Sequence, residues 1–319
     1  MKFRTMTCVL ALGLSNCSPA EPPVEDNQMV APTPEATETA AQSDTLMSWA
    51  DLLAMERAEP QAVHAYGELE QQVIDIWLPE GEGPHPVVLM VHGGCWQKAI
   101  ANRTLMNYMA EALRQRGLAV WNIEYRGVDE AGGGYPGTFQ DVSAAADALI
   151  ASGADYNLDT SRIVGLGHSA GGHLVTWLAA RENVPDGSVL AGGEPLSMRA
   201  VINSGGLADL EASAPVTLET CLANIQDQLT GTSTDGREDV FADTSSARLQ
   251  PSSVPQISVN GAMDHIAPPA LGIGYTDVVS QDGGEAQFVE VQGAGHVELI
   301  APGTEAFDVQ AELIERYLK

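Results

Sequence analysis

The chain has few basic residues for its length. Its 319 residues include 15 lysines and arginines against 43 aspartates and glutamates, so the formal net charge is −28 at pH 7. Such a charge repels nucleic-acid phosphates and disfavours docking onto anionic membrane surfaces. We therefore expect no nucleic-acid partner, and we interpret the acidity as an aid to solubility.

Long apolar runs are also lacking. The run MTCVLALGL is shorter than the roughly 18 apolar residues that a membrane-spanning helix needs. It follows Lys2 and Arg4, as in an export signal, and is followed by LSNC, which resembles a bacterial lipobox ending at Cys17. We predict a lipoprotein-type signal over residues 1–17, with Cys17 lipidated at the periplasmic face of a bacterial membrane. The alternative is cleavage after residues 18–20, which releases a soluble periplasmic or secreted protein.

Large apolar residues are scarce over residues 18–45, which are acidic and rich in proline, alanine and threonine. Ordering this segment would cost entropy with little burial in return, so we predict a disordered linker. The folded domain is expected over residues 46–319. No repeat of solenoid period is visible in it.

Cysteine is rare, and metal-binding patterns are missing. No histidine and cysteine spacing resembles a zinc site, and no nucleotide-binding fingerprint follows the first strand-like run. We therefore expect neither a metal nor a cofactor. If Cys8 leaves with the signal and Cys17 carries lipid, then Cys95 and Cys221 remain of the four cysteines. In an exported protein these two form either a disulfide or two buried thiols.

The chain does contain short apolar, β-branched runs that alternate with helical patterns. Strands are expected over residues 71–79, 86–94, 118–126, 161–167, 199–206, 255–261 and 286–293. Helices are expected between residues 94 and 118, from Thr138 with Asp141 in a capping box, over 217–231, and at the C-terminal end. Buried strands joined by helices predict an α/β fold, a mostly parallel sheet with helices on both faces. Functional sites in such folds form beyond the carboxyl ends of the strands.

Two glycine-rich motifs lie at such strand ends. GLGHSAGG (165–172) follows a strand and opens a helix, the context in which Ser169 becomes a nucleophile on a sharp turn. HGG (92–94) ends another strand. There the amides of Gly93 and Gly94, together with that of Ala170, can form an oxyanion hole for a reacting carbonyl oxygen.

The last two strands offer an acid and a base. NGAMDHIAP contains Asp264 and QGAGHVE contains His296. The order Ser169, Asp264, His296 is that of nucleophile, acid and base on this type of sheet. His296 would take the serine proton and return it to the leaving group, while Asp264 holds the imidazole tautomer. Asp209 and Glu298 are rival acids and His265 is a rival base; we expect His92 to brace the HGG loop.

With these motifs the chain resembles the α/β-hydrolase superfamily, and within it the esterases close to kynurenine formamidase and the feruloyl-esterase-like (BD-FAE-like) group. The resemblance is carried by HGGCW, EYR (124–126), YPGTFQDV (135–142), GHSAGGHL and the surroundings of Asp264 and His296. It implies a serine esterase that needs no cofactor and acts on a small-molecule ester. It also implies the roles given above to Ser169, Asp264, His296, Gly93, Gly94 and Ala170.

The surroundings of the site are less regular. Insertions after a strand end in this fold lie over the active site, so residues 206–250 are expected to form a small lid. This segment contains Cys221, and we hypothesise a disulfide from it to Cys95. Cys95, Trp96 and His168 are the candidate pocket residues.

Short-chain or aryl esters are the expected substrates, because no extended apolar cap is evident. The alternatives are an arylformamidase-type amide hydrolase and a prolyl-oligopeptidase-like peptidase. A non-catalytic hydrolase-like binding lipoprotein is a further alternative, although it would predict a damaged site.

Overall fold

The protein is described by a computed structural model that covers residues 45–192, 195–217, 221–222 and 224–319. The predicted signal (1–17), Cys17 and all but the last residue of the predicted linker (18–45) lie outside these residues. No helix in the described part of the chain is long and apolar enough to cross a membrane.

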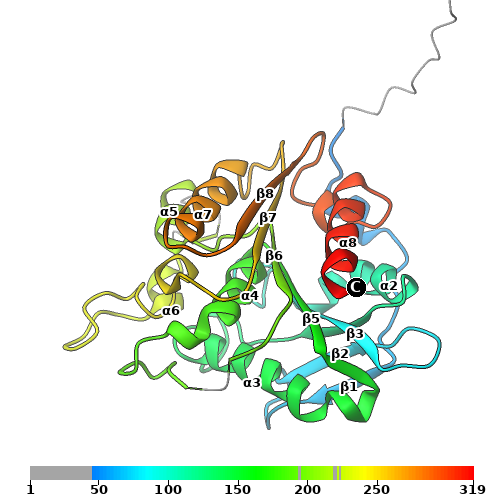
Figure 1. Cartoon of the computed structure of the whole chain (residues 1–319). Helices are drawn as coiled ribbons and strands as arrows, with labels where there is room; N and C mark the ends of the chain where they lie inside the picture. The colour runs from blue at the N-terminus through cyan, green and yellow to red at the C-terminus, as the bar shows by residue number, and fades with distance from the viewer. Residues whose placement is uncertain (1–44, 193–194, 218–220, 223) are drawn as a thin grey trace, which may run out of the picture. The chain divides into compact units, whose positions relative to one another are not determined.

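A single eight-stranded sheet organises the domain (Figure 1), in the spatial order β1-β2-β4-β3-β5-β6-β7-β8. β2 pairs antiparallel with both β1 and β4, and every later pair is parallel. The predicted mostly parallel sheet is therefore confirmed. The strands are β1 (Ala62–Ala65), β2 (Val73–Trp77), β3 (His85–Val91), β4 (Ala119–Ile123), β5 (Leu158–His168), β6 (Ala200–Ser204), β7 (Gln256–Gly261) and β8 (Ala286–Val291).

Helices cover both faces of this sheet, which is why its central strands are apolar on both sides. Val87 and Leu89 of β3 point into a core that includes α3 (Gly137–Ser152) and α4 (Ala170–Ala180). Val88 and Met90 alternate to the other face, where α2 (Asn107–Gln115) and α8 (Glu305–Leu318) cover them (Figure 1). α7 (Pro269–Gln281) packs against β7 and β8.

Two helix predictions were wrong in detail. Residues 217–231 do not form one helix: α5 (Leu210–Val216) ends before them and α6 (Gln226–Thr230) covers only their end. The capping box at Thr138 is not made, because α3 starts after Pro136 and Asp141 pairs with Arg126 at 2.7 Å. The Thr138 hydroxyl donates instead to the carbonyl of Arg126, at 2.5 Å.

Four elements were not predicted, namely β1, α1 (Trp49–Leu53), α5 and α7. β1 is a short edge strand whose residues are half-buried or exposed, so it carries little apolar signal. The short helix α1 begins at Ser48, whose side chain and that of Asp51 form a reciprocal capping box. The remaining helices are short 3₁₀ turns, among them one over Arg103–Met106 that leads into α2.

Candidate active site

Ser169 lies on a strained turn between β5 and α4. Its backbone adopts φ 56° and ψ −121°, a conformation that costs a non-glycine residue about 1–3 kcal/mol. The turn is tight enough that a Cβ on Gly167 would lie 2.0 Å from the carbonyl oxygen of Gly171. A Cβ on Gly171 would lie 2.1 Å from that of Val91. The glycines of the motif therefore permit the turn, which places Ser169 at the carboxyl end of β5.

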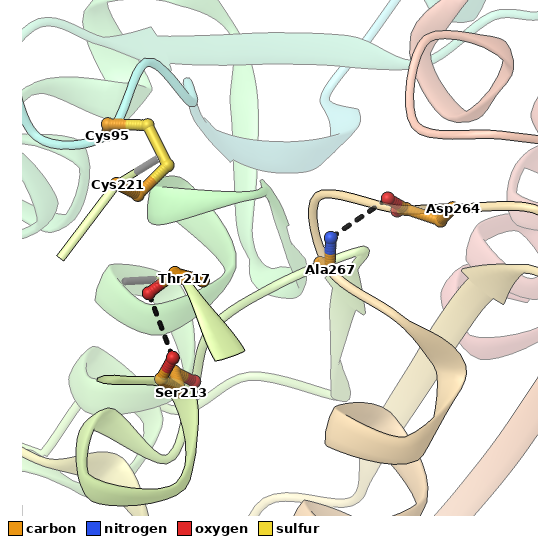
Figure 2. Close-up of a disulfide and its surroundings, with 6 residues drawn as sticks. All are labelled: Cys95, Ser213, Thr217, Cys221, Asp264 and Ala267. Atoms are coloured by element: carbon orange, nitrogen blue, oxygen red, sulfur yellow. Dashed lines mark hydrogen bonds between the residues drawn. A yellow bond between two sulfur atoms is a disulfide. The ribbon is translucent and has the colours of Figure 1, made fainter. Parts of the chain in front are cut away.

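Asp264 and His296 meet beyond the ends of β7 and β8. His296 Nδ1 lies 2.6 Å from Asp264 Oδ2 in a buried contact. The other carboxylate oxygen accepts the amide of Ile266 at 2.8 Å. It also accepts the amide of Ala267 at 2.9 Å (Figure 2), and these two hydrogen bonds fix the carboxylate. Because a carboxylate accepts from Nδ1, that nitrogen carries the proton and Nε2 of His296 is left as a proton acceptor.

His168 supports the loop that carries His296. Its Nε2 donates to the His296 carbonyl at 3.1 Å, and the two rings lie 4.4 Å apart between centroids. Burial, with a smaller electrostatic effect of the neighbouring His296, holds the pKa of His168 well below its usual value. His168 is therefore an uncharged ring in the wall of the pocket, where it was predicted.

The HGG loop lies against the serine. A Cβ on Gly93 would be 3.0 Å from the Ser169 Cβ, so glycine allows this close approach without moving the serine. Gly94 has φ +110° and lines the same pocket. Ala170 is the first residue of α4, and its amide belongs to the helix terminus that has no carbonyl partner within the helix. Of the three predicted oxyanion residues, Gly93 and Ala170 thus lie next to Ser169, and Gly94 lines the same pocket.

A buried ionic network holds this loop in place. Glu124, the first residue of EYR, is fully buried and contacts His92 Nε2 at 2.8 Å and Lys98 Nζ at 2.7 Å. Burial by itself would raise the pKa of Glu124, but these two partners lower it to about 2. The carboxylate stays charged and ties both ends of the loop to β4. His92 thus has the bracing position expected for it.

Cys95 and Cys221 are joined by a disulfide (Figure 2). Cys95 lines the pocket, as predicted. Trp96 does not, and its prediction as a pocket residue is corrected: it is fully buried, and its Nε1 donates to His173 Nδ1 at 3.2 Å. Burial lowers the pKa of His173 to about 4, so its neutral ring accepts from Trp96 and donates to the Thr244 carbonyl at 2.7 Å.

The pocket in front of Ser169 has a volume of about 430 Å³. Besides the residues described above, two segments that the sequence analysis missed line it: α1 with the residues after it, and the stretch from Ile100 to Leu105. The Trp49 ring lies 6.2 Å from that of His296 and 6.4 Å from that of His168. The lining residues missed are Trp49, Leu53, Arg57, Ile100, Ala101, Asn102, Thr104, Leu105 and Ile266. The signal for α1 was present in the S-x-x-D pattern of residues 48–51.

The described part of the predicted lid, residues 206–250, contributes none of the pocket lining. It reaches the site through Cys221, whose disulfide partner Cys95 lies in the wall. Residues 218–220 and 223, next to Cys221, lie outside the described residues.

The rival acids have other roles. Asp209 accepts the Ala212 amide at 3.0 Å and caps α5. Glu298 accepts the amide of Gly295 at 3.0 Å and that of Met47, so it joins the segment before α1 to the His296 loop. The rival base His265 is exposed. No group of three or more histidine, cysteine, aspartate or glutamate side chains in the described chain could hold a metal ion.

Comparison with known proteins agrees with this geometry. A probable isoprenylcysteine alpha-carbonyl methylesterase from Arabidopsis thaliana is 31% identical over 110 residues, 34% of this chain and 22% of the relative. The kynurenine formamidase of Danio rerio is 28% identical over 121 residues, 37% of this chain and 38% of the relative. The chain thus spans well under half the length of these curated relatives.

The fold is also shared with solved structures. Esterase B from Lactobacillus rhamnosis aligns with a TM-score of 0.68 at 18% identity, covering 82% of this chain and 87% of that one. The BD-FAE family model matches residues 74–273, which is more than half of the chain and includes Ser169 and Asp264. The chain therefore belongs to the BD-FAE family of α/β-hydrolase esterases.

Proposed function

We propose that the protein hydrolyses small carboxylic esters through an acyl-serine intermediate on Ser169. The observation that carries the proposal is the shared position of Ser169 and His296 in one pocket, with His296 held by Asp264 at 2.6 Å. The strained backbone of Ser169 supports it, since such strain persists at functional sites where the surrounding structure enforces it. A non-catalytic binding protein would need neither feature.

The proposed reaction follows the chemistry of these groups. His296 Nε2 takes the Ser169 proton as the hydroxyl oxygen attacks the ester carbonyl carbon. The amides of Gly93, Gly94 and Ala170 stabilise the oxyanion, each at typically about 3 kcal/mol. The imidazolium then gives its proton to the departing alkoxide, leaving the acyl-serine. Water, deprotonated by His296, attacks the acyl carbon. His296 then returns this proton to the Ser169 oxygen as the bond between this oxygen and the acyl carbon breaks, and the carboxylic acid product leaves.

The pocket favours short-chain or aryl esters. Its volume is in the lower part of the range of small-molecule sites, and Trp49, Leu53, Ile100 and Leu105 make its walls largely apolar. Amide hydrolysis of the arylformamidase type is the second candidate, supported by the similarity to a kynurenine formamidase. Export as a lipoprotein anchored through Cys17 remains a separate proposal, motivated by the N-terminal sequence.

The test is a comparison of the purified protein with Ser169→Ala. Both are assayed against p-nitrophenyl acetate, butyrate and octanoate, a feruloyl ester and N-formylkynurenine. We expect turnover of at least one short ester or feruloyl ester, reduced at least about a thousandfold by the substitution. Ser280→Ala, which alters an exposed serine on α7, is the matched control and should behave as the unaltered protein. Equal rates in Ser169→Ala and the unaltered protein would refute the proposal, and turnover of N-formylkynurenine alone would favour the amidase alternative.

A further inference from the structure

The pocket contains one unexpected charge. Among the described residues that line it, Arg57 is the only one with a permanent charge, and none is an aspartate or glutamate. This contrasts with the whole chain, where acidic residues outnumber basic ones 43 to 15. The lining of the pocket is therefore positively charged, whereas the chain as a whole is negatively charged.

Arg57 is also unlike the other cations near the site. Lys98 and Arg103 are bound to the buried carboxylates Glu124 and Asp75. Arg57 forms no ion pair within the described chain, and its one hydrogen bond runs from Nη1 to the Thr104 hydroxyl at 3.3 Å. Its acidic sequence neighbours Glu56 and Glu59 do not line the pocket. A guanidinium has five N–H donors, so Arg57 keeps most of its donors for a ligand.

The position of Arg57 fits recognition of a distal group. Arg57 lies after the C-terminal end of α1, whereas Trp49, at the start of this helix, has its ring 6.2 Å from that of His296. Leu53, at the end of α1, also lines the pocket, so the apolar side chains of α1 come between His296 and the cation along this segment. The Thr104 hydroxyl, in the lining stretch from Ile100 to Leu105, accepts a hydrogen bond from the guanidinium. An ester with an apolar or aromatic middle and an anionic end matches this order of groups.

The charge of the whole protein makes such a cation necessary for an anionic substrate. A chain of net charge −28 repels anions at a distance. A positive group in the pocket is therefore needed for an ester with a carboxylate at one end to bind better than its neutral counterpart. Arginine suits this role because its planar N–H groups match both oxygens of a carboxylate.

We infer that the pocket selects esters that carry a carboxylate at the end remote from the scissile bond, and that Arg57 binds this carboxylate. The inference rests on the proposed esterase function, whose site it refines. Arg57 is a specificity-determining residue in it and takes no part in the chemical steps. The carboxylate can belong to the acyl or to the alcohol portion, and the test distinguishes these two sources.

The experiment uses pairs of esters that differ only in charge. The acyl pair is the p-nitrophenyl hemiester of glutaric acid and its carboxamide, and the alcohol pair is 4-acetoxybenzoate and 4-acetoxybenzamide. The measured quantity is the ratio of kcat/KM between carboxylate and carboxamide in each pair. We expect a ratio above one in one pair, falling about tenfold in Arg57→Gln, as for loss of a charge-assisted hydrogen bond from this exposed side chain. Arg57→Lys should keep part of the preference.

A distant charge provides the control. Arg162 lies near the start of β5, at the opposite end of this strand from Ser169, where it is half-buried and pairs with Asp159 at 2.6 Å. Arg162→Gln removes the same charge and should leave both ratios unchanged. Equal ratios in the unaltered protein and Arg57→Gln would overturn the inference, as would a preference for a trimethylammonium analogue over the carboxylate.

A binding measurement separates this inference from the proposed function. Calorimetric titration of Ser169→Ala with 4-acetoxybenzoate, its carboxamide and glutarate hemiamide requires no turnover. 4-Acetoxybenzoate or glutarate hemiamide, which carry a carboxylate, should bind about tenfold more tightly than the neutral carboxamide. This difference in affinity should be lost in Ser169→Ala/Arg57→Gln. If this difference is found but no ester is cleaved, the proposed function fails and Arg57 still recognises carboxylates. Cleavage of esters without any effect of Arg57→Gln in either assay refutes this inference alone.

Discussion

Gly205 shows how closely the backbone approaches the pair formed by Asp264 and His296. It follows β6 directly and has φ +51°. A Cβ there would lie 3.1 Å from Asp264 Oδ2, 3.2 Å from His296 Nδ1 and 2.7 Å from Leu299 Cδ1. No side chain at this position can be accommodated without moving the carboxylate or the imidazole. Gly205 thus positions the proposed catalytic base although it has no reactive group.

We therefore predict that Gly205→Ala lowers kcat/KM about 10- to 100-fold while the protein remains folded. Displacing a catalytic group by a fraction of an ångström to 1 Å costs up to about a hundredfold in rate. The measurement is ester hydrolysis together with the circular dichroism spectrum. Gly187→Ala is the control, since a Cβ there meets no atom within 4 Å. A Gly205→Ala enzyme with unaltered kcat/KM would show that the approach does not constrain the pair.

The secondary-structure elements carry the site residues at their ends. Ser169 follows β5, Gly205 follows β6, and the Asp264 and His296 loops follow β7 and β8. These strands are parallel neighbours, so their carboxyl ends meet along one edge of the sheet. The packing of helices on the strands keeps this edge in register. α7 follows the Asp264 loop and contains two glycines, Gly272, which packs against the sheet, and Gly274, which does not.

Substitution of these two glycines should change stability in opposite directions. A Cβ on Gly274 would meet no atom within 4 Å, so Gly274→Ala should raise the free energy of unfolding by about 0.5–1 kcal/mol through helix propensity. A Cβ on Gly272 would lie 2.2 Å from Asn260 Oδ1 and 3.0 Å from the Phe288 ring. Gly272→Ala should lower it by about 1–3 kcal/mol, because the helix must move away from β7 and β8.

Urea denaturation of the two variants and the unaltered protein provides the measurement. The two helix substitutions are each other's control, since both replace glycine by alanine in α7. A stabilised Gly272→Ala variant would mean that the contact with β7 and β8 relaxes without cost.

At the scale of the whole molecule, the disulfide joins two cysteines that lie far apart in the sequence. Cys95 lies in the pocket wall next to Gly94, and its partner lies 126 residues further along the chain. The bond closes a loop that includes β4, β5 and β6. Closing so long a loop restricts the unfolded chain and can stabilise the fold by up to about 5 kcal/mol in the chain-entropy description.

Reduction should therefore lower the thermal midpoint of unfolding. We expect a fall of several degrees in Tm when the protein is scanned with a phosphine reductant, because for a domain of this size 1 kcal/mol is about 2–4 °C. Cys95→Ala/Cys221→Ala should show the lower Tm with and without reductant. Identical Tm values for the unaltered protein, with mass spectrometry showing its thiols reduced, would contradict this expectation.

Much of the predicted structure follows from local sequence patterns. The order of strands and helices, the Ser169 turn and the loops after β7 and β8 depend on apolar periodicity and on glycines close by in sequence, so they could be identified from residues alone. The helix expected over 217–231 and the capping box at Thr138 failed because tertiary contacts prevailed: a disulfide at Cys221 and the pairing of Asp141 with Arg126. β1 and α1 were too short to show a clear period.

The sequence by itself determined the fold class, the family resemblance and the candidate nucleophile, acid and base, because each is encoded in a short motif at a strand end. Only the tertiary structure decided what surrounds them. It placed Trp49, Leu53 and Arg57 in the pocket, brought Cys221 to Cys95, and turned Trp96 into the core. The physical reason is that a pocket wall is assembled from segments far apart in the chain, whose meeting depends on the packing of the entire sheet and its helices.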